Sequence, residues 1–126
     1  MTADPIKVVG VGVDLINPMR IRTLIASHPK RFYQTLLSPA EKKRYSFSKW
    51  TPVLASKLFA AKEAFFKATG ASWLGVQGFA DIEVFALPNS QFKVKSHRFG
   101  RSNYQAVGTF FKAKSLVGAQ VILFAV

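Results

Sequence analysis

Only six acidic side chains are available for carboxylate chemistry in this chain of 126 residues. Four of them are expected in ordinary positions, at the start of the chain, in a helix capping box and on the outward face of a strand: Asp4, Glu41, Asp81 and Glu83. The other two are Asp14 and Glu63. These two side chains are the candidates for catalysis or metal binding.

Asp14 ends the valine-rich segment KVVGVGVDLI, Lys7 to Ile16, which predicts a buried strand that is apolar on both faces. Alternate residues of a strand share a face, so Gly10, Gly12 and Asp14 line one face together. Two glycines beside a carboxylate leave room for a ligand or another backbone to approach closely. For Asp14 alone, a polar strand end beside a packing notch fits as well as a functional site.

Glu63 belongs to the segment FAAKEAFFKATG, which is part of a long helix predicted from Pro52 to Thr69 and ended by Gly70. It shares a helix face with two phenylalanines and Lys67. An unpaired carboxylate among aromatic side chains is costly. Either Lys67 forms an ordinary i,i+4 ion pair with Glu63, or a second carboxylate shares a cation with it.

A divalent cation between Asp14 and Glu63 would give both carboxylates a role. Mg²⁺ binds one or two protein carboxylates and completes its shell with substrate phosphates and water. The 18 Lys and Arg residues give a net charge of +12, which attracts polyanions such as nucleic acid, phosphate-bearing cofactors, anionic membranes or acidic proteins. A basic protein with a two-carboxylate magnesium site is most simply a phosphate-handling enzyme.

Caps and apolar patterns predict the elements that would position these side chains. Asn17-Pro18 starts a short helix that ends near Ser27, and His28-Pro29 separates it from a second helical piece, PKRFYQTLL. The capping box SPAE starts a polar helix, EKKRYSFSK. Four later segments have strand patterns: ADIEVFAL, QFKVKS, SNYQAVGTFF and GAQVILFAV. We expect an α+β fold, with one N-terminal strand, three to four helices and then an antiparallel sheet, in a single domain over residues 1–126.

The composition narrows the class of protein. The chain has no cysteine, so disulfides and thiolate metal sites are excluded. No apolar run approaches the roughly 20 residues that span a bilayer, and the start, MTADPIKVVG, does not have the pattern of a signal peptide. We expect a cytoplasmic protein. The apolar segment VILFAV fits either a core strand or an interface.

Three segments in this order and spacing, GVGVDLINPMRI, FAAKEAFFKATG and FADIEV, resemble the holo-acyl-carrier-protein synthases, which are small trimeric phosphopantetheinyl transferases. That family is marked by a G-x-G-x-D strand end and an F-A-x-K-E-A-x-x-K-A helix. The resemblance covers most of residues 9–84 and returns weakly in GAQVILFAV. It implies a homotrimer that transfers 4′-phosphopantetheine from coenzyme A to a serine of apo acyl carrier protein, releasing adenosine 3′,5′-bisphosphate, and so a role in fatty acid biosynthesis.

The resemblance also implies roles for single residues. Asp14 and Glu63 match the Mg²⁺ ligands, and the ion would bridge to the pyrophosphate of coenzyme A. Lys67 matches the helix lysine that neutralises charge on this pyrophosphate. Glu63 and Lys67 are thus the expected catalytic residues, with Glu63 accepting the serine proton directly or through a water molecule.

Further residues match positions that contact the coenzyme or the carrier protein. The expected coenzyme contacts are Lys57, Lys62, Lys67, Gly70, Ala71, Ser72 and Lys112. The basic surface expected to receive the acidic helix of the carrier protein consists of Arg20, Lys30 and Arg31.

The chain departs from the family pattern at two positions. Leu58 stands where the family commonly has arginine, and Lys112 stands where it often has histidine. Both family residues are associated with binding coenzyme phosphates. Lys57, next to Leu58, and Lys112 could replace the charge, although a lysine is a point charge and not a two-pronged donor. A catalytically inactive family member therefore remains an alternative.

A nucleic-acid-binding module is the main rival from another class. The stretch QFKVKSHRFGRSNY combines basic side chains with aromatic ones that could stack on bases. The same lysines could instead protect an exposed sheet edge, and no RNP-type motif is present. His28 and His97 match no motif and are expected at a helix end and in a surface loop.

Overall fold

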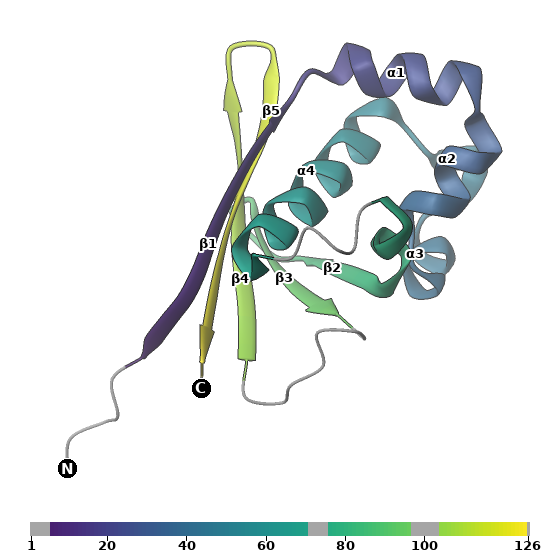
Figure 1. The fold of residues 1–126 in the computed structure, drawn as a ribbon. Helices are drawn as coiled ribbons and strands as arrows, with labels where there is room; N and C mark the ends of the chain where they lie inside the picture. The colour runs from purple at the N-terminus through teal and green to yellow at the C-terminus, as the bar shows by residue number, and fades with distance from the viewer. Residues whose placement is uncertain (1–5, 71–75, 97–103, 126) are drawn as a thin grey trace.

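The computed structural model describes residues 6–70, 76–96 and 104–125. It confirms the α+β fold class: one strand and a helical region precede the other strands of an antiparallel sheet (Figure 1). The strands are β1 (Lys7–Ile16), β2 (Ile82–Ala86), β3 (Gln91–Ser96), β4 (Tyr104–Ala113) and β5 (Leu116–Ala125). The helices are α1 (Pro18–Ser27), α2 (Pro29–Leu36), α3 (Pro39–Arg44) and α4 (Pro52–Thr69), with 3₁₀ helices η1 (Phe47–Lys49) and η2 (Val76–Asp81).

Local side-chain chemistry sets the helix boundaries. The Asn17 side chain accepts a hydrogen bond from the Met19 N–H at the start of α1, and Thr51 does the same for Leu54 at the start of α4. Gly70 ends α4 with φ of +70°, a left-handed conformation that favours glycine. The polar helix expected after SPAE is shorter than its sequence pattern, because α3 ends at Arg44. None of the helices in the described ranges is long and apolar enough to cross a membrane.

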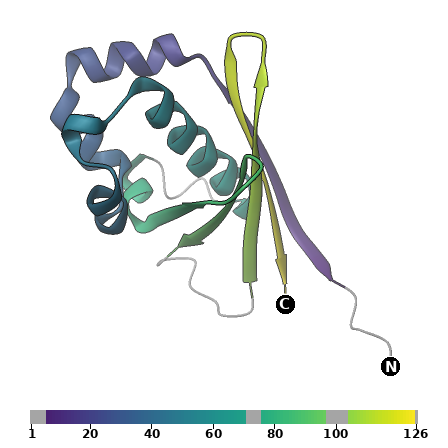
Figure 2. The same cartoon turned by 180° about the vertical axis from the view of Figure 1, so that it is seen from behind.

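The five strands form one antiparallel sheet in the order β1-β5-β4-β3-β2. All the helices lie on one face of this sheet, as the two opposite views show (Figures 1 and 2). Helix α4 lies directly on β1 and β5 and buries Ala61, Ala64 and Phe65. The core therefore sits between α4 and the sheet, and the shorter helices close its outer side.

The two glycines of β1 form a packing notch for α4. A Cβ atom added at Gly10 would lie 1.8 Å from the Ala68 carbonyl oxygen, and one at Gly12 would lie 1.9 Å from that of Ala64. Any side chain here would push the helix off the strand. The glycine-lined face of β1, which ends at Asp14, is thus in backbone contact with α4.

The face of β1 that points away from α4 is exposed, so the prediction of a buried strand is wrong for this face. The strand is not buried on both faces, because Val11, Val13 and Leu15 are 52%, 44% and 49% exposed. Among the described strands, β1 lies at the edge of the sheet and pairs with β5 alone, and the helices cover the opposite face of the sheet. Val11 is in register with Ile122 of β5, which extends the apolar surface across the sheet.

Candidate active site between the first strand and the long helix

Side chains from the end of β1 and from α4 meet where the glycine notch brings the two elements together. The Lys67 ammonium donates hydrogen bonds to Asp14 Oδ1 and to the Val13 carbonyl oxygen, each at 3.0 Å. The Lys67 side chain is 53% exposed and that of Asp14 is 16% exposed, so this pair lies at the surface. Among the described residues, Lys67 is paired with Asp14 across the elements, and the i,i+4 ion pair with Glu63 is not formed.

Glu63 lies within electrostatic reach of the same aspartate. Burial raises the pKa of the Glu63 carboxyl above its usual value, and the negative charge of Asp14 raises it further. The cations Lys67 and Arg20 oppose this rise in the pKa without cancelling it. Two carboxylates that repel one another in a partly buried site are the arrangement that a bound cation would relieve.

The donor set fits Mg²⁺. No group of three or more His, Asp or Glu side chains that could hold a metal occurs in the described part of the chain. A site with only Asp14 and Glu63 leaves most coordination positions to water and substrate oxygens, which is the usual manner of binding Mg²⁺. The Lys67 ammonium already places one positive charge against Asp14 Oδ1.

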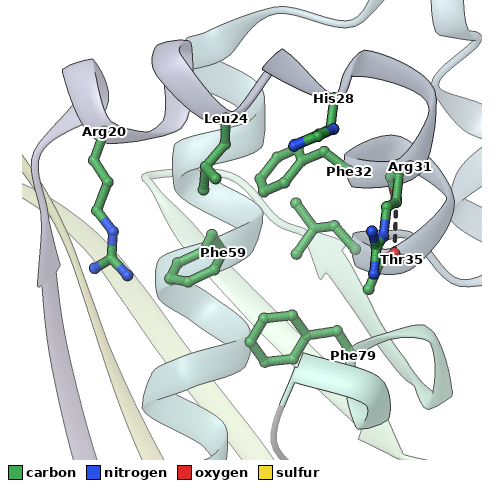
Figure 3. Close-up of a pocket in the computed structure, with 9 residues that line it drawn as sticks. Arg20, Leu24, His28, Arg31, Phe32, Thr35, Phe59 and Phe79 are labelled. Carbon is green, nitrogen blue, oxygen red and sulfur yellow. Dashed lines mark hydrogen bonds between the residues drawn. The ribbon is translucent and has the colours of Figure 1, made fainter. Parts of the chain in front are cut away.

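An apolar cavity of about 570 Å³ lies between α1, α2, α4 and η2 (Figure 3). Its apolar lining consists of Leu24, Phe32, Leu36, Phe59 and Phe79. Arg20, His28 and Arg31 add positively charged or ionisable groups, and the figure shows Arg20 extending from α1 toward α4. Two of the three residues expected to receive a carrier protein thus line one cavity, while Lys30 is exposed on α2. His28 joins α1 to α2, as expected for a helix-end residue.

Lys62 lies in the core and not, as the family resemblance implies, at a coenzyme-binding surface. Its side chain is 0% exposed, and its ammonium donates to the Leu36 carbonyl at 2.6 Å, to Glu41 Oε1 at 2.6 Å and to the Phe79 carbonyl at 3.0 Å. Burial lowers the pKa of Lys62, and the negative charge of Glu41 partly opposes this effect. Because all three N–H donors are used inside the protein, the expected contact of Lys62 with the coenzyme is wrong for this structure.

The sequence did carry a signal for this burial. Lys62 is four residues after Leu58 and three before Phe65, so helical spacing puts it on the apolar face of α4. Glu41 forms the predicted capping box with Ser38. It is also the buried partner of Lys62 and accepts a hydrogen bond from the Val84 N–H at 2.8 Å.

The other expected coenzyme residues lie away from Asp14 and Glu63 or outside the described residues. The Lys57 ammonium lies 5.8 Å from the centroid of the Phe110 ring, beside a second cavity of about 300 Å³. Leu58 is buried against this cavity, and Lys112 is exposed on β4, two residues beyond Phe110. Gly70 is exposed at the end of α4, while Ala71 and Ser72 fall outside the described residues.

The remaining acids do not join the site. Glu83 does not point freely outward, because its side chain is 12% exposed and pairs with Arg44. Asp81 belongs to η2 and not to a strand. Asp4 and His97 fall outside the described residues.

Comparisons with known proteins identify the family. The family model of the 4′-phosphopantetheinyl transferase superfamily matches residues 10–119. A holo-[acyl-carrier-protein] synthase from an Azoarcus species is 33% identical over 91 residues, which are 72% of this chain and 70% of the relative. The protein of the same name from Chlamydia pneumoniae is 33% identical over 97 residues, 75% of this chain and 79% of the relative.

A solved structure agrees in fold. The holo-(acyl-carrier-protein) synthase of Bacillus anthracis, in complex with CoA (3′,5′-ADP), matches this structure with a TM-score of 0.75 at 23% sequence identity, over 95% of this chain and 99% of that one. The motifs around Asp14 and Glu63 lie within the region that the family model matches. As these motifs predicted, the chain belongs to the holo-[acyl-carrier-protein] synthase family, within the 4′-phosphopantetheinyl transferase superfamily.

Proposed function

We propose that residues 1–126 act as a single transferase domain that moves 4′-phosphopantetheine from coenzyme A to a serine of apo acyl carrier protein. Adenosine 3′,5′-bisphosphate is the leaving product, and the reaction depends on Mg²⁺. One observation carries the proposal furthest: Asp14 on β1 and Glu63 on α4 repel each other across the interface of the two elements, with the Lys67 ammonium beside them. Family membership supplies the class of reaction.

Asp14 and Glu63 would hold the Mg²⁺ ion, because they are the two oxygen donors that share this surface site. When bound, Mg²⁺ supplies positive charge to the pyrophosphate of the coenzyme, where negative charge develops as the phosphoryl group is transferred. Lys67 is more than half exposed and can exchange its bond to Asp14 for one to a phosphate oxygen. It then adds a second positive charge to the same group.

Glu63 is the proposed acceptor of the serine proton, directly or through a water molecule. Burial and Asp14 raise the pKa of Glu63 in the metal-free protein, and a bound Mg²⁺ would oppose this rise and keep the carboxylate ionised to accept a proton. Cation binding and proton transfer thus depend on the same pair of elements.

The other proposed coenzyme contacts are Lys57, Lys112, Gly70, Ala71 and Ser72. Lys57 contacts the ring of Phe110, and Lys112 follows on the same face of β4, so the two ammonium groups belong to one region of the surface. This charge could stand in for the arginine and histidine that the family pattern has at these places. Because Leu58 is buried and apolar, it contributes no charge there.

The proposed carrier-protein surface consists of Arg20, Lys30 and Arg31 around the 570 Å³ cavity. Its guanidinium groups suit the carboxylates of an acidic helix, and its apolar floor suits an apolar side chain from the same helix. The net charge of +12 favours association with such a partner.

We also propose that the protein is a homotrimer. Val11, Val13 and Leu15 form an exposed apolar surface on the edge strand, and the apolar residues of β5 continue it. Apolar patches of this kind commonly mark protein–protein contacts. The cytoplasmic location expected from the sequence stays a prediction.

The rival nucleic-acid interpretation loses part of its support. In β3, Phe92 is buried while Lys93 and Lys95 are exposed, so this aromatic ring is not presented to bases. The alternating pattern is that of an ordinary strand with one face in the core. The rest of the basic stretch, residues 97–103, falls outside the described residues.

A transfer assay tests the proposal directly. Apo acyl carrier protein, coenzyme A and the purified protein should give carrier protein with one added phosphopantetheine arm, detected by intact-protein mass spectrometry. The product should vanish on removal of Mg²⁺ with a chelator and return when Mg²⁺ is restored. Binding of the carrier protein or coenzyme without any transfer would instead support an inactive family member.

A further inference from the structure

The buried ion pair between Glu41 and Lys62 joins four separate segments to α4. Lys62 contacts the end of α2 through the Leu36 carbonyl and η2 through the Phe79 carbonyl. Glu41, which is 0% exposed, connects the start of α3 to β2 through the Val84 N–H. Neither residue reaches the surface, so the pair has no direct part in binding a substrate.

Lys62 and Glu63 are consecutive on α4, so their side chains leave the helix about 100° apart. Fixing the direction of one therefore fixes the direction of the other. Three acceptors hold the Lys62 ammonium on one side of α4. On another side, the backbone contacts of Gly10 and Gly12 hold the helix against β1.

We propose that Lys62 and Glu41 are positioning residues, which fix the rotation of α4 about its axis so that the Glu63 carboxylate is directed toward Asp14 and shares one divalent cation with it. The inference rests on the proposed function, because it assumes that Asp14 and Glu63 bind the ion. Groups that orient metal ligands without touching the metal commonly contribute 10–100-fold to metal affinity.

Substitutions at the ion pair must separate positioning from simple stability. Lys62→Met keeps much of the side-chain length but leaves the Glu41 carboxylate without its partner, which is a destabilising change. The double variant Glu41→Gln/Lys62→Met removes both charges, and glutamine can still serve in the capping box. Removing both charges leaves no uncompensated charge in the core, so this variant should be less destabilised than Lys62→Met.

Ser56→Ala is the matched control. Ser56 is also fully buried on α4, and its hydroxyl donates to the Pro52 carbonyl within the same helix. The substitution therefore perturbs α4 without touching the ion pair. Asp14→Asn serves as the reference for a lost metal ligand.

The readout is the affinity for Mn²⁺, an oxygen-binding substitute for Mg²⁺, measured by electron paramagnetic resonance without coenzyme and well below each melting temperature. We expect the double variant to bind Mn²⁺ about 10–100-fold more weakly than the wild type, and Ser56→Ala to bind it as the wild type does. The single variant Lys62→Met should show a similar loss of affinity if it folds.

Two results would overturn the inference, and they have different consequences. A folded double variant, or a folded Lys62→Met variant, with wild-type Mn²⁺ affinity would show that the pair is only structural, and the proposed function would stand. If wild type and Asp14→Asn both fail to bind Mn²⁺, the inference and the metal site of the proposed function fail together.

Discussion

Lys67 donates a 3.0 Å hydrogen bond to Asp14 across the junction of β1 and α4, although Glu63 lies one turn away on its own helix. The lysine thus compensates the charge of Asp14, while the pKa of Glu63 stays raised by burial and by Asp14. This arrangement keeps one cation and two carboxylates at a single point of the surface. Under the proposed function, stability, metal binding and transfer would all depend on the charges of these three side chains.

The raised pKa of Glu63 predicts how stability changes with pH in the metal-free protein. The folded state favours the protonated carboxyl, so the contribution of Glu63 is fully present below its usual pKa of 4.5. It is lost as the pH rises through the raised value of the folded state. The variant Glu63→Gln has no ionisable carboxyl group at this position, so its stability lacks this dependence on pH. The free energy of unfolding of Glu63→Gln should therefore rise relative to that of the wild type as the pH increases above 4.5.

Chemical denaturation in a chelator checks this pH prediction. Glu83→Gln is a suitable control because Glu83 pairs with Arg44 away from the site. Saturating Mg²⁺ should stabilise the wild type and not Glu63→Gln. Parallel pH curves for wild type and Glu63→Gln would contradict the electrostatic account.

Lys67→Met should separate metal binding from transfer. Without the ammonium group, Asp14 loses a competing cation, so Mn²⁺ should bind at least as tightly as in the wild type. The transfer rate should fall about 10²-fold, the usual effect of removing one group that stabilises developing charge. A parallel loss of Mn²⁺ affinity would show that Lys67 acts mainly by holding the site together. Lys49→Met, a change in η1, is the control.

Gly12→Ala should disturb both the fold and the site. The added Cβ atom would meet the Ala64 carbonyl oxygen, so α4 must move away from β1 at a cost of about 1–3 kcal/mol. Such a shift separates Glu63 from Asp14, and Mn²⁺ affinity should fall with stability. Gly70→Ala strains a positive φ instead, with open space around the new atom. It should lower stability without a matching loss of Mn²⁺ affinity.

The starts of α1, α3 and α4 and the end of α4 were predictable because they depend on local chemistry, whereas the end of α3 was not. Asn17, Ser38 and Thr51 cap helix starts with their own side chains, and Gly70 ends α4 through its conformation. The α+β order followed from the same signals. The pairing of Lys67 could not be predicted, because the choice between Asp14 and Glu63 depends on how closely β1 approaches α4.

Two errors have physical causes in tertiary structure. The valine pattern of β1 predicts a strand. It does not show whether other parts of the same chain cover each apolar face, and one face of β1 is exposed. The family motif predicts a coenzyme contact for Lys62, whereas its helical spacing places it on the apolar face of α4. Its partner Glu41 comes from a distant helix, so the ion pair itself had no local signal.

Val11→Lys tests the proposed trimer. Val11 is about half exposed on the uncovered face of the sheet, so lysine should cost the isolated chain little while placing a charge in a contact between copies. Analytical ultracentrifugation should show trimers for the wild type and smaller species for the variant. Met19→Lys, at an exposed methionine of α1, is the control for a new charge elsewhere. A monomeric wild type would contradict the proposal.

The most direct test of the central claim is a crystal structure with Mn²⁺ and coenzyme A, in which the anomalous signal locates the metal. The account predicts one ion bound by both Asp14 and Glu63, with the coenzyme pyrophosphate completing its shell and Lys67 turned toward the phosphates. An ion bound elsewhere, or Glu63 paired with Lys67 while the pyrophosphate binds without metal at this site, would contradict it.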